Sequence, residues 1–155
     1  MKENISKHIT YKEATYSPTA VRKGITNSPI DVQLSRMKEL AEEVFEPCRL
    51  EFKEPIYINS FFRSITLNSV IGGSSTSQHC AGEAFDIRLG HNSELTNKQL
   101  FYYIKDNLDF DQLIWEFGND NSPKWIHVSY RKGENRKQVL KAKRIDGVVR
   151  YNPFV

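Results

Sequence analysis

The sequence predicts a single α+β domain in which a mostly antiparallel sheet is flanked by helices. Residues 31–46 have helical periodicity, and a series of short β-prone runs follows them. Residues 118–123, between two of these runs, are dense in turn formers, which is typical of a hairpin. Strands that follow one another favour α+β over an alternating α/β fold. A chain of 155 residues, of which 39% are hydrophobic, can form one buried core.

The first part of the chain predicts a wrapping segment and one long helix. Residues 1–28 are polar and rich in turn formers, so we expect them to wrap around the domain rather than to form its core. Ser28 followed by Pro29 is typical of a helix start. Apolar residues then recur every three or four positions, which predicts a helix over 31–46 that ends at Pro47.

The middle of the chain predicts two strands separated by a loop. Residues 55–60 form a short β-prone run. The polar segment 62–78 is expected to be a loop with one helical turn near residues 66–70. Apolar residues alternate with other residues over 84–89, which predicts a half-buried strand.

The last part of the chain predicts a capped helix and further strands. Residues 96–99 fit a capping box that opens a helix of about ten residues. Residues 113–117 and 125–130 predict the two strands of the hairpin, and residues 145–151 predict a last strand.

The charge of the chain is distributed unevenly. The formal net charge is +3, but the segment from Arg131 to Arg144 holds seven Lys or Arg residues and one Glu. Such a segment is either a solvated face or a surface for a polyanionic partner, such as nucleic acid or a cell-wall polymer. It lacks interleaved aromatic residues and any nucleic-acid-binding signature, so we do not expect nucleic acid as a partner.

The sequence predicts no membrane span, no disulfide bond and no functional role for His8 and His91. No apolar run is long enough to span a bilayer, and residues 1–12 lack the apolar core of a secretory signal. Cys48 and Cys80 form no CxxC pair, and two reduced thiols are favoured over one disulfide. Cys80 follows a histidine and is a minor candidate for a nucleophile. His8 and His91 lie in polar contexts and are expected to be solvated.

Three candidate metal ligands lie in or beside predicted strands. His79 precedes the strand over 84–89, Asp86 lies inside it, and His127 lies in the middle of the strand over 125–130. A carboxylate inside an apolar strand is costly to bury unless it is paired or bound to a metal. Two imidazoles and one carboxylate suit zinc, with the fourth coordination position open for water. A hydrogen bond between a core histidine and aspartate, without metal, is the alternative.

Glu116 is the favoured catalytic base, because a zinc-bound water needs a group that takes its proton and returns it to the leaving amine. Glu116 lies inside an apolar run, and it shares a face with His127 if it pairs with an odd-numbered residue of the next strand. An outward-facing glutamate on a half-exposed sheet is the alternative. Asp111 and Asp120 are weaker candidates, because aspartates in turns usually bond the backbone.

Arg63 follows the first predicted strand. Its planar guanidinium can hold a substrate carboxylate through two parallel hydrogen bonds. A surface salt bridge is the alternative role for this side chain.

Two stretches together resemble a known family. The pattern S-x-H-x-x-G-x-A-x-D over residues 77–86, followed by W-I-H-V-S over 125–129, is similar to that of the zinc D-Ala-D-Ala carboxypeptidases. These are peptidoglycan peptidases with the Hedgehog/DD-peptidase fold. N-S-F-F-R-S over residues 59–64 is similar to the family's S-G-Y-R-S segment, with Phe61 in place of Gly. The likeness extends over about residues 30–130, and it is greatest to the short, single-domain members often carried by bacteriophages and gut bacteria.

The resemblance implies a site and a substrate. One zinc ion is expected on His79, Asp86 and His127. Arg63 would stabilise the polarised carbonyl or hold a substrate carboxylate, while Ser77 and Gln78 would line the substrate cleft. The implied partners are peptidoglycan stem peptides or cross-links that contain D-amino acids. The protein is expected to be a monomer that is either free or part of a virion, and it would act on the cell wall after release from the cytoplasm of a bacterial host.

One position departs from the family pattern. Many members place Glu or Asp three residues before the last zinc-binding histidine, as the base, and here that residue is Lys124, which cannot accept a proton. Either Glu116 takes the role, with Asp120 as the second choice, or the domain is a non-catalytic wall-binding or virion structural module. The sequence leaves open whether the enzyme is a carboxypeptidase that trims a terminal D-residue or an endopeptidase of the endolysin type.

Overall fold

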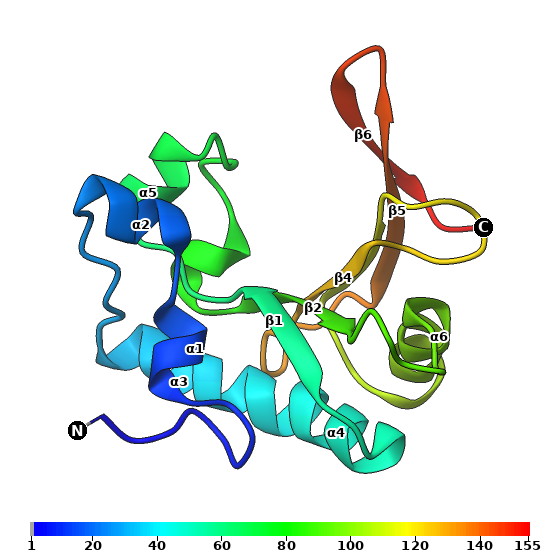
Figure 1. Cartoon of the computed structure of the whole chain (residues 1–155), viewed down its shortest axis with the longest axis horizontal. Helices are drawn as coiled ribbons and strands as arrows, with labels where there is room; N and C mark the ends of the chain where they lie inside the picture. The colour runs from blue at the N-terminus through cyan, green and yellow to red at the C-terminus, as the bar shows by residue number, and fades with distance from the viewer. Residues whose placement is uncertain (1) are drawn as a thin grey trace.

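A six-stranded sheet organises the chain in the computed structural model, which describes residues 2–155 (Figure 1). The strand order is β1-β2-β4-β3-β5-β6. All neighbouring strands are antiparallel except β3 and β5, so the prediction of an α+β fold with a mostly antiparallel sheet is confirmed. The strands are β1 (Ile56–Ser60), β2 (Ala84–Leu89), β3 (Gln112–Glu116), β4 (Trp125–Ser129), β5 (Gln138–Ile145) and β6 (Val148–Pro153).

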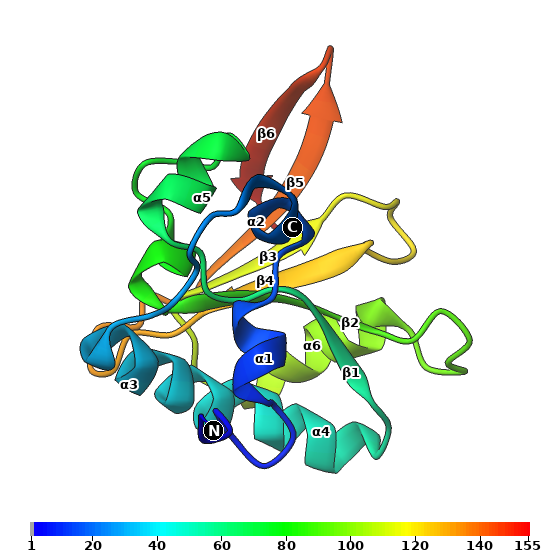
Figure 2. The ribbon, with the colours of Figure 1, turned by 60° about the vertical axis from the view of Figure 1, so that its left-hand side comes forward.

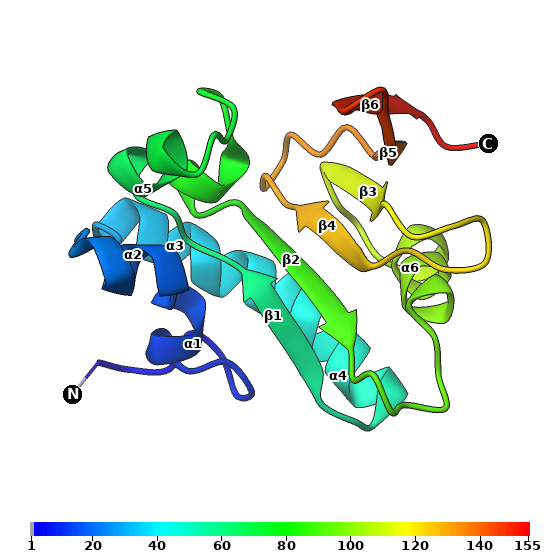
Figure 3. The same ribbon diagram turned by 45° about the horizontal axis from the view of Figure 1, so that its top comes forward.

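Helices cover one face of this sheet. Figure 3 shows the long helical segment beneath β1 and β2, with α6 beneath the far end of the sheet. None of the helices in residues 2–155 is long and apolar enough to cross a membrane. The long segment consists of α3 (Asp31–Leu40), the π-helical turn η1 (Ala41–Phe45) and α4 (Glu46–Phe52). The other elements are α1 (Tyr11–Thr15), α2 (Pro18–Lys23), α5 (Ile65–Val70), the 3₁₀ turn η2 (Gln78–Ala81) and α6 (Asn97–Asn107).

The core lies between these helices and the sheet. Phe85 of β2 makes edge-to-face contacts with Phe45 and Phe61, at centroid separations of 6.0 and 5.2 Å. At the other end, Phe101 of α6 packs on Trp115 of β3 at 5.2 Å. Successive side chains of a strand point to opposite faces, so the residues between these core side chains point away from the helices. That second face carries the candidate site.

The predicted helix end at Pro47 is wrong, because the helical segment continues to Phe52. In a regular α-helix, the proline ring collides with the carbonyl four residues earlier, and the missing N–H leaves that carbonyl without a partner. The wider π-turn just before Pro47 relieves this conflict, since the Glu46 N–H donates to the carbonyl of Ala41, five residues back. A sequence read with the α-helical period alone cannot anticipate such a turn.

The predicted start of this helix at residue 31 is confirmed, but the expected cap at Ser28 is wrong. Ser28 and Pro29 lie outside the helix, and Ile30 is the N-cap residue of α3. The side chain of Gln33 accepts a hydrogen bond from the Ile30 N–H at 2.9 Å, so this glutamine supplies the capping interaction that was expected of Ser28.

The N-terminal segment contributes to the core, which corrects the expectation that it only wraps around the domain. Ile5 and Ile9 are buried in the main core cluster. Ala14 of α1 is also buried, and its carbonyl accepts a hydrogen bond from the Phe62 N–H at 3.0 Å. These apolar residues are single and irregularly spaced, so no periodicity revealed them.

The predicted last strand over 145–151 is in fact the outer part of a hairpin formed by β5 and β6. Its two-residue turn is Asp146-Gly147, with φ of 50° and 77°, as a type I′ hairpin turn requires. We call residues 138–153 the β5–β6 hairpin. It projects beyond the rest of the sheet (Figure 2). The many charged residues of β5 hid its strand character from the sequence pattern.

The buried carboxylate of Asp111 fastens the segment just before β5 to the sheet. It accepts hydrogen bonds from Nε and Nη2 of Arg136 at 2.9 and 2.8 Å, and from the Arg136 backbone N–H at 3.0 Å. Gln78 donates to the same carboxylate at 3.0 Å. The hydrogen bonds from Arg136 hold the pKa of Asp111 at about 2, against the upward effect of burial.

The long helical segment offers a matched test of the core. Leu40 is fully buried and Leu50 is 78% exposed, although both lie on the same helical segment. Leu40→Ala should lower the free energy of unfolding by about 2–5 kcal/mol, because it removes buried methyl groups and leaves a cavity. Leu50→Ala should change it by less than about 0.5 kcal/mol. Urea unfolding of both variants measures the difference, and equal losses would contradict the core described above.

Asp111 should make the stability depend on pH in the acid range. Its pKa is depressed in the folded state, so its stabilising effect is present above about pH 4 and is lost as the pH falls towards about 2. Asp111→Asn should therefore destabilise the protein at pH 7 and flatten the fall in unfolding free energy between about pH 4 and about pH 2. Urea unfolding at several pH values measures this, with Asp146→Asn in the exposed hairpin turn as the control. A profile for Asp111→Asn parallel to that of the wild type would disprove the assignment.

Candidate metal centre

The register of β2 and β4 sets two of the three candidate ligands side by side. Asp86 pairs directly with His127 across the two strands. Their strand neighbours Phe85 and Val128 are buried in the core, so Asp86 and His127 lie on the opposite face of the sheet. The apolar alternation that forms the core thus also directs the carboxylate and the imidazole into the same space.

The third candidate ligand, His79, is held by η2. The Ser77 hydroxyl accepts a hydrogen bond from the His79 N–H at 3.3 Å and so caps this short turn. Gly82 ends the turn with a left-handed φ of 77°, and a Cβ atom there would lie only 2.5 Å from the backbone oxygen of Gln33 in α3. Only glycine lets η2 lie this close to α3, which gives a physical reason for the glycine in the 77–86 pattern.

The three side chains converge on one small volume. One potential ligand atom from each of His79, Asp86 and His127 lies within 4.8 Å of the other two. Oδ1 of Asp86 is 3.0 Å from Nδ1 of His127 and 3.4 Å from Nε2 of His79. The structure therefore brings together the residues that the sequence proposed as a metal-binding set.

The hydrogen bonding of His79 tests whether this set fits a metal ion. Nδ1 of His79 lies 2.7 Å from the carbonyl oxygen of Phe61, and since a carbonyl only accepts, Nδ1 must carry the proton. In a neutral ring, Nε2 then offers a lone pair, and this buried atom has no hydrogen-bond partner among the described residues. A carbonyl that fixes the tautomer from behind is the usual support for a metal-binding histidine. The donor set therefore fits a zinc ion.

Electrostatics favour the protonation states that a metal ion needs. Burial would raise the pKa of Asp86, but the two neighbouring imidazoles outweigh burial and hold it below its usual range. Burial lowers the pKa of His79, with the Asp86 carboxylate opposing the shift. A charged carboxylate beside a neutral imidazole is the state in which both groups bind a cation.

Glu116 lies at the end of β3 and borders the same cleft as the three ligands. It pairs with Trp125, an odd-numbered residue, so the condition for sharing a face with His127 is met. Diagonal neighbours of this kind have Cα atoms about 7–8 Å apart. Its side chain is buried, which excludes the alternative of an outward-facing glutamate. Burial raises the pKa of Glu116 to about 7, with His127 opposing the rise and Asp86 adding to it.

The other candidates for base or nucleophile lie in unsuitable places. The carboxylate of Asp111 is taken up by Arg136 and Gln78. Asp120 is exposed on the turn after β3 and pairs with Lys141 at 2.8 Å. It does not line the cleft, so the second choice for the catalytic base is wrong. Lys124 is exposed and does not line the cleft. Burial raises the pKa of the Cys80 thiol, which keeps it protonated and poorly nucleophilic.

Arg63 borders the cleft. Its Nη1 donates to Oδ1 of Asn68 at 3.0 Å, and Asn68 in turn donates to the carbonyl of Ser74 at 2.8 Å. Gly73 allows this packing, since a Cβ there would lie 2.0 Å from the Asn68 side chain. Arg63 forms no salt bridge within residues 2–155, so the alternative of a surface ion pair is wrong, and its charge remains available to a ligand.

Ser77 and Gln78 both line the cleft, and both are also used to build it. The Ser77 hydroxyl caps η2, and the Gln78 amide donates to Asp111 at 3.0 Å. Of the other histidines, His91 is exposed as expected, whereas His8 is not simply solvated: its Nδ1 lies 2.6 Å from Glu46.

The cleft around these residues has a volume of about 930 Å³. Several side chains that line it were not predicted from the sequence, and four of these belong to the β5–β6 hairpin or to the segment before it. The basic residues of that segment are not a uniform solvated face: Arg131 pairs with Glu83 at 3.5 Å and with Glu134 at 3.0 Å. The unpredicted lining residues include Glu83, Gln112, Phe117, Arg131, Arg136, Leu140 and Tyr151.

Sequence comparison is consistent with this site. The chain matches the family described as peptidase M15 over residues 7–129, a stretch that includes the three candidate ligands, Arg63 and Glu116. No curated protein sequence matches the chain. The matched stretch covers most of the chain, and the protein is therefore a member of the peptidase M15 family.

Proposed function

We propose that this protein is a zinc-dependent metallopeptidase that hydrolyses D-amino-acid-containing peptide bonds of bacterial peptidoglycan. The observation that carries the proposal is the unpartnered Nε2 of His79, which is buried within 4.8 Å of ligand atoms of Asp86 and His127. The assignment to peptidoglycan is supported by membership of the peptidase M15 family and by the motif resemblance over residues 77–86 and 125–129.

The side chains of the cleft divide the chemistry between them. When bound to three protein ligands, a zinc ion supplies a Lewis acid and an open coordination position. Glu116 has a pKa of about 7, so it can both take up and release a proton near neutral pH. That suits a group that accepts a proton from the attacking water and passes it to the leaving amine. Arg63 offers an unpaired cation to a substrate carboxylate or to a carbonyl oxygen that gains negative charge.

The metal site can be tested by metal analysis of matched histidine variants. The purified protein should carry about one zinc ion per chain, and a chelator should remove both the ion and the activity. His127→Ala should reduce the zinc content to near background, because two ligands hold zinc far less tightly than three. His91→Ala, in an exposed turn, is the control and should retain the zinc. Equal zinc contents in both variants would rule out this metal site.

The role of Glu116 can be tested on purified peptidoglycan. Glu116→Gln should lower kcat by about 10²–10⁴-fold, because the amide cannot accept a proton, while the zinc content stays unchanged. Asp120→Asn, in the exposed turn, should keep the wild-type rate. Mass spectrometry of the released muropeptides measures the rate and shows whether a terminal D-residue or an internal bond is cut. An unchanged rate in Glu116→Gln would exclude it as the base. A wild type that binds zinc and peptidoglycan but cleaves nothing would instead indicate a non-catalytic module.

A further inference from the structure

The β5–β6 hairpin extends one wall of the cleft beyond the metal centre. Residues 138–142 of β5 pair with β3, whereas β5 and β6 continue past the end of β3 with only each other as partners. At about 3.3 Å per residue, this free part is roughly 10 Å long. It projects from the sheet in Figures 1 and 2. The family match ends at residue 129, so the hairpin is a feature that the family assignment does not explain.

The two faces of the hairpin differ in chemistry. Leu140 and Tyr151 line the cleft, and strand alternation gives the same face to Arg144, two pairs further towards the tip. Lys141 lies on the other face, with its Nζ 5.0 Å from the centre of the Trp115 ring. The directly paired residues Lys143 and Arg150 share that back face. The hairpin therefore presents aromatic and cationic groups to the cleft and a separate cationic pair to the back.

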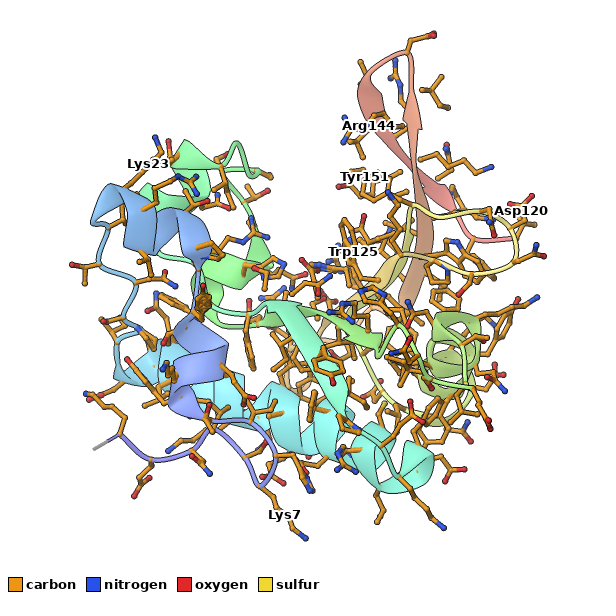
Figure 4. All side chains as sticks on the ribbon, viewed as in Figure 1. Lys7, Lys23, Asp120, Trp125, Arg144 and Tyr151 are labelled. Carbon is orange, nitrogen blue, oxygen red and sulfur yellow. The ribbon has the colours of Figure 1, made fainter. Side chains whose placement is uncertain are left out.

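Three aromatic side chains and one arginine gather where the hairpin meets the cleft. We call Phe117, Trp125, Tyr151 and Arg144 the aromatic shelf. The rings of Phe117 and Trp125 meet edge to face at 5.4 Å, and the Arg144 guanidinium lies 5.7 Å from the centre of the Phe117 ring. Figure 4 shows Trp125, Tyr151 and Arg144 on the side of the hairpin that faces α2 and α5.

The backbone of Phe117 indicates that this arrangement is costly to maintain. Phe117 has φ of 58°, a left-handed conformation that bulky residues rarely adopt. Such strain persists where the surroundings impose it, and it is concentrated at ligand-binding sites. Tyr151 is 55% exposed, and it lines the cleft together with Phe117 and Trp125. The shelf thus offers ring faces to a ligand.

We propose that the aromatic shelf binds the glycan strand of peptidoglycan while the attached stem peptide lies over the metal centre. This inference rests on the proposed function, since it takes the glycan to be the part of the same polymer that continues past the scissile peptide. Sugar rings carry apolar C–H faces that pack on aromatic rings, and hydroxyls that pair with guanidinium and phenol groups. A polyanion would instead favour the back face of the hairpin, where the two cations Lys143 and Arg150 lie opposite each other on neighbouring strands.

The two faces of the hairpin provide matched variants for a binding test. The probes are purified peptidoglycan sacculi stripped of phosphate-containing polymers, assayed by co-sedimentation on ice, and a soluble stem peptide without sugar, assayed by hydrolysis. Tyr151→Ala and Arg144→Gln should each weaken binding to sacculi about tenfold, and Tyr151→Phe should retain most of the binding because it keeps the ring. The back-face variant Lys143→Gln/Arg150→Gln should bind like the wild type.

The outcomes separate the alternatives. Hydrolysis of the sugar-free peptide should fall far less in Tyr151→Ala than binding to sacculi does; equal losses would mean that the shelf holds the peptide, and would overturn the glycan assignment. Loss of binding in the back-face variant alone, with a steep dependence on salt, would indicate that the hairpin binds a polyanion and would also overturn the glycan assignment. Unchanged binding in every variant would overturn the glycan assignment as well. If the wild type releases no peptide from sacculi, the proposed function fails, yet the comparison of the two faces still decides whether the shelf binds glycan.

Discussion

A half-buried aspartate between two imidazoles is the interaction on which the rest of this structure depends. Oδ1 of Asp86 lies 3.0 Å from His127 and 3.4 Å from His79, inside a strand whose Phe85, Ile87 and Leu89 belong to the core. A carboxylate in this position is costly without partners. The neighbouring imidazoles keep it charged, and Nε2 of His79, which has no hydrogen-bond partner among the described residues, offers its lone pair to the same volume. The sheet, η2 and the long helical segment can all be understood as the support for this arrangement.

The support works through backbone geometry more than through side-chain contacts. The β2–β4 register sets Asp86 opposite His127, and the β3–β4 register brings Glu116 to the same face. A register shift of one residue in either pair would turn the functional side chains towards the helices and the apolar ones towards the cleft. The core therefore protects the site, because any such shift would expose Phe85 and Val128 to water.

The basic segment before and within the β5–β6 hairpin has several separate roles. Arg136 compensates the buried carboxylate of Asp111, and Lys141 lies over the Trp115 ring while it pairs with Asp120. Arg131 is neutralised by two glutamates. Only part of the segment therefore remains as free positive charge. A count of charges along the sequence overstates how basic this surface is, since it cannot see which charges are paired within the fold.

The sequence by itself determined the alternating strands, the capped helix α6 and the identity of the candidate metal-binding set. These depend on local signals: the two-residue period of a strand, the capping box of residues 96–99, and histidines and a carboxylate in otherwise apolar runs. Glu116 could be proposed for the same reason, because a charge inside an apolar strand needs an explanation. The continuation of the helix through Pro47 and the β5–β6 hairpin were not determined in this way, since a π-turn and a strongly charged strand leave no clear period. Only the tertiary structure decided that Asp111 is taken up by Arg136, that Asp120 lies away from the cleft and that Tyr151 lies on it. These outcomes depend on contacts between residues far apart in the chain, and such contacts are fixed by how the strands pair rather than by any local pattern.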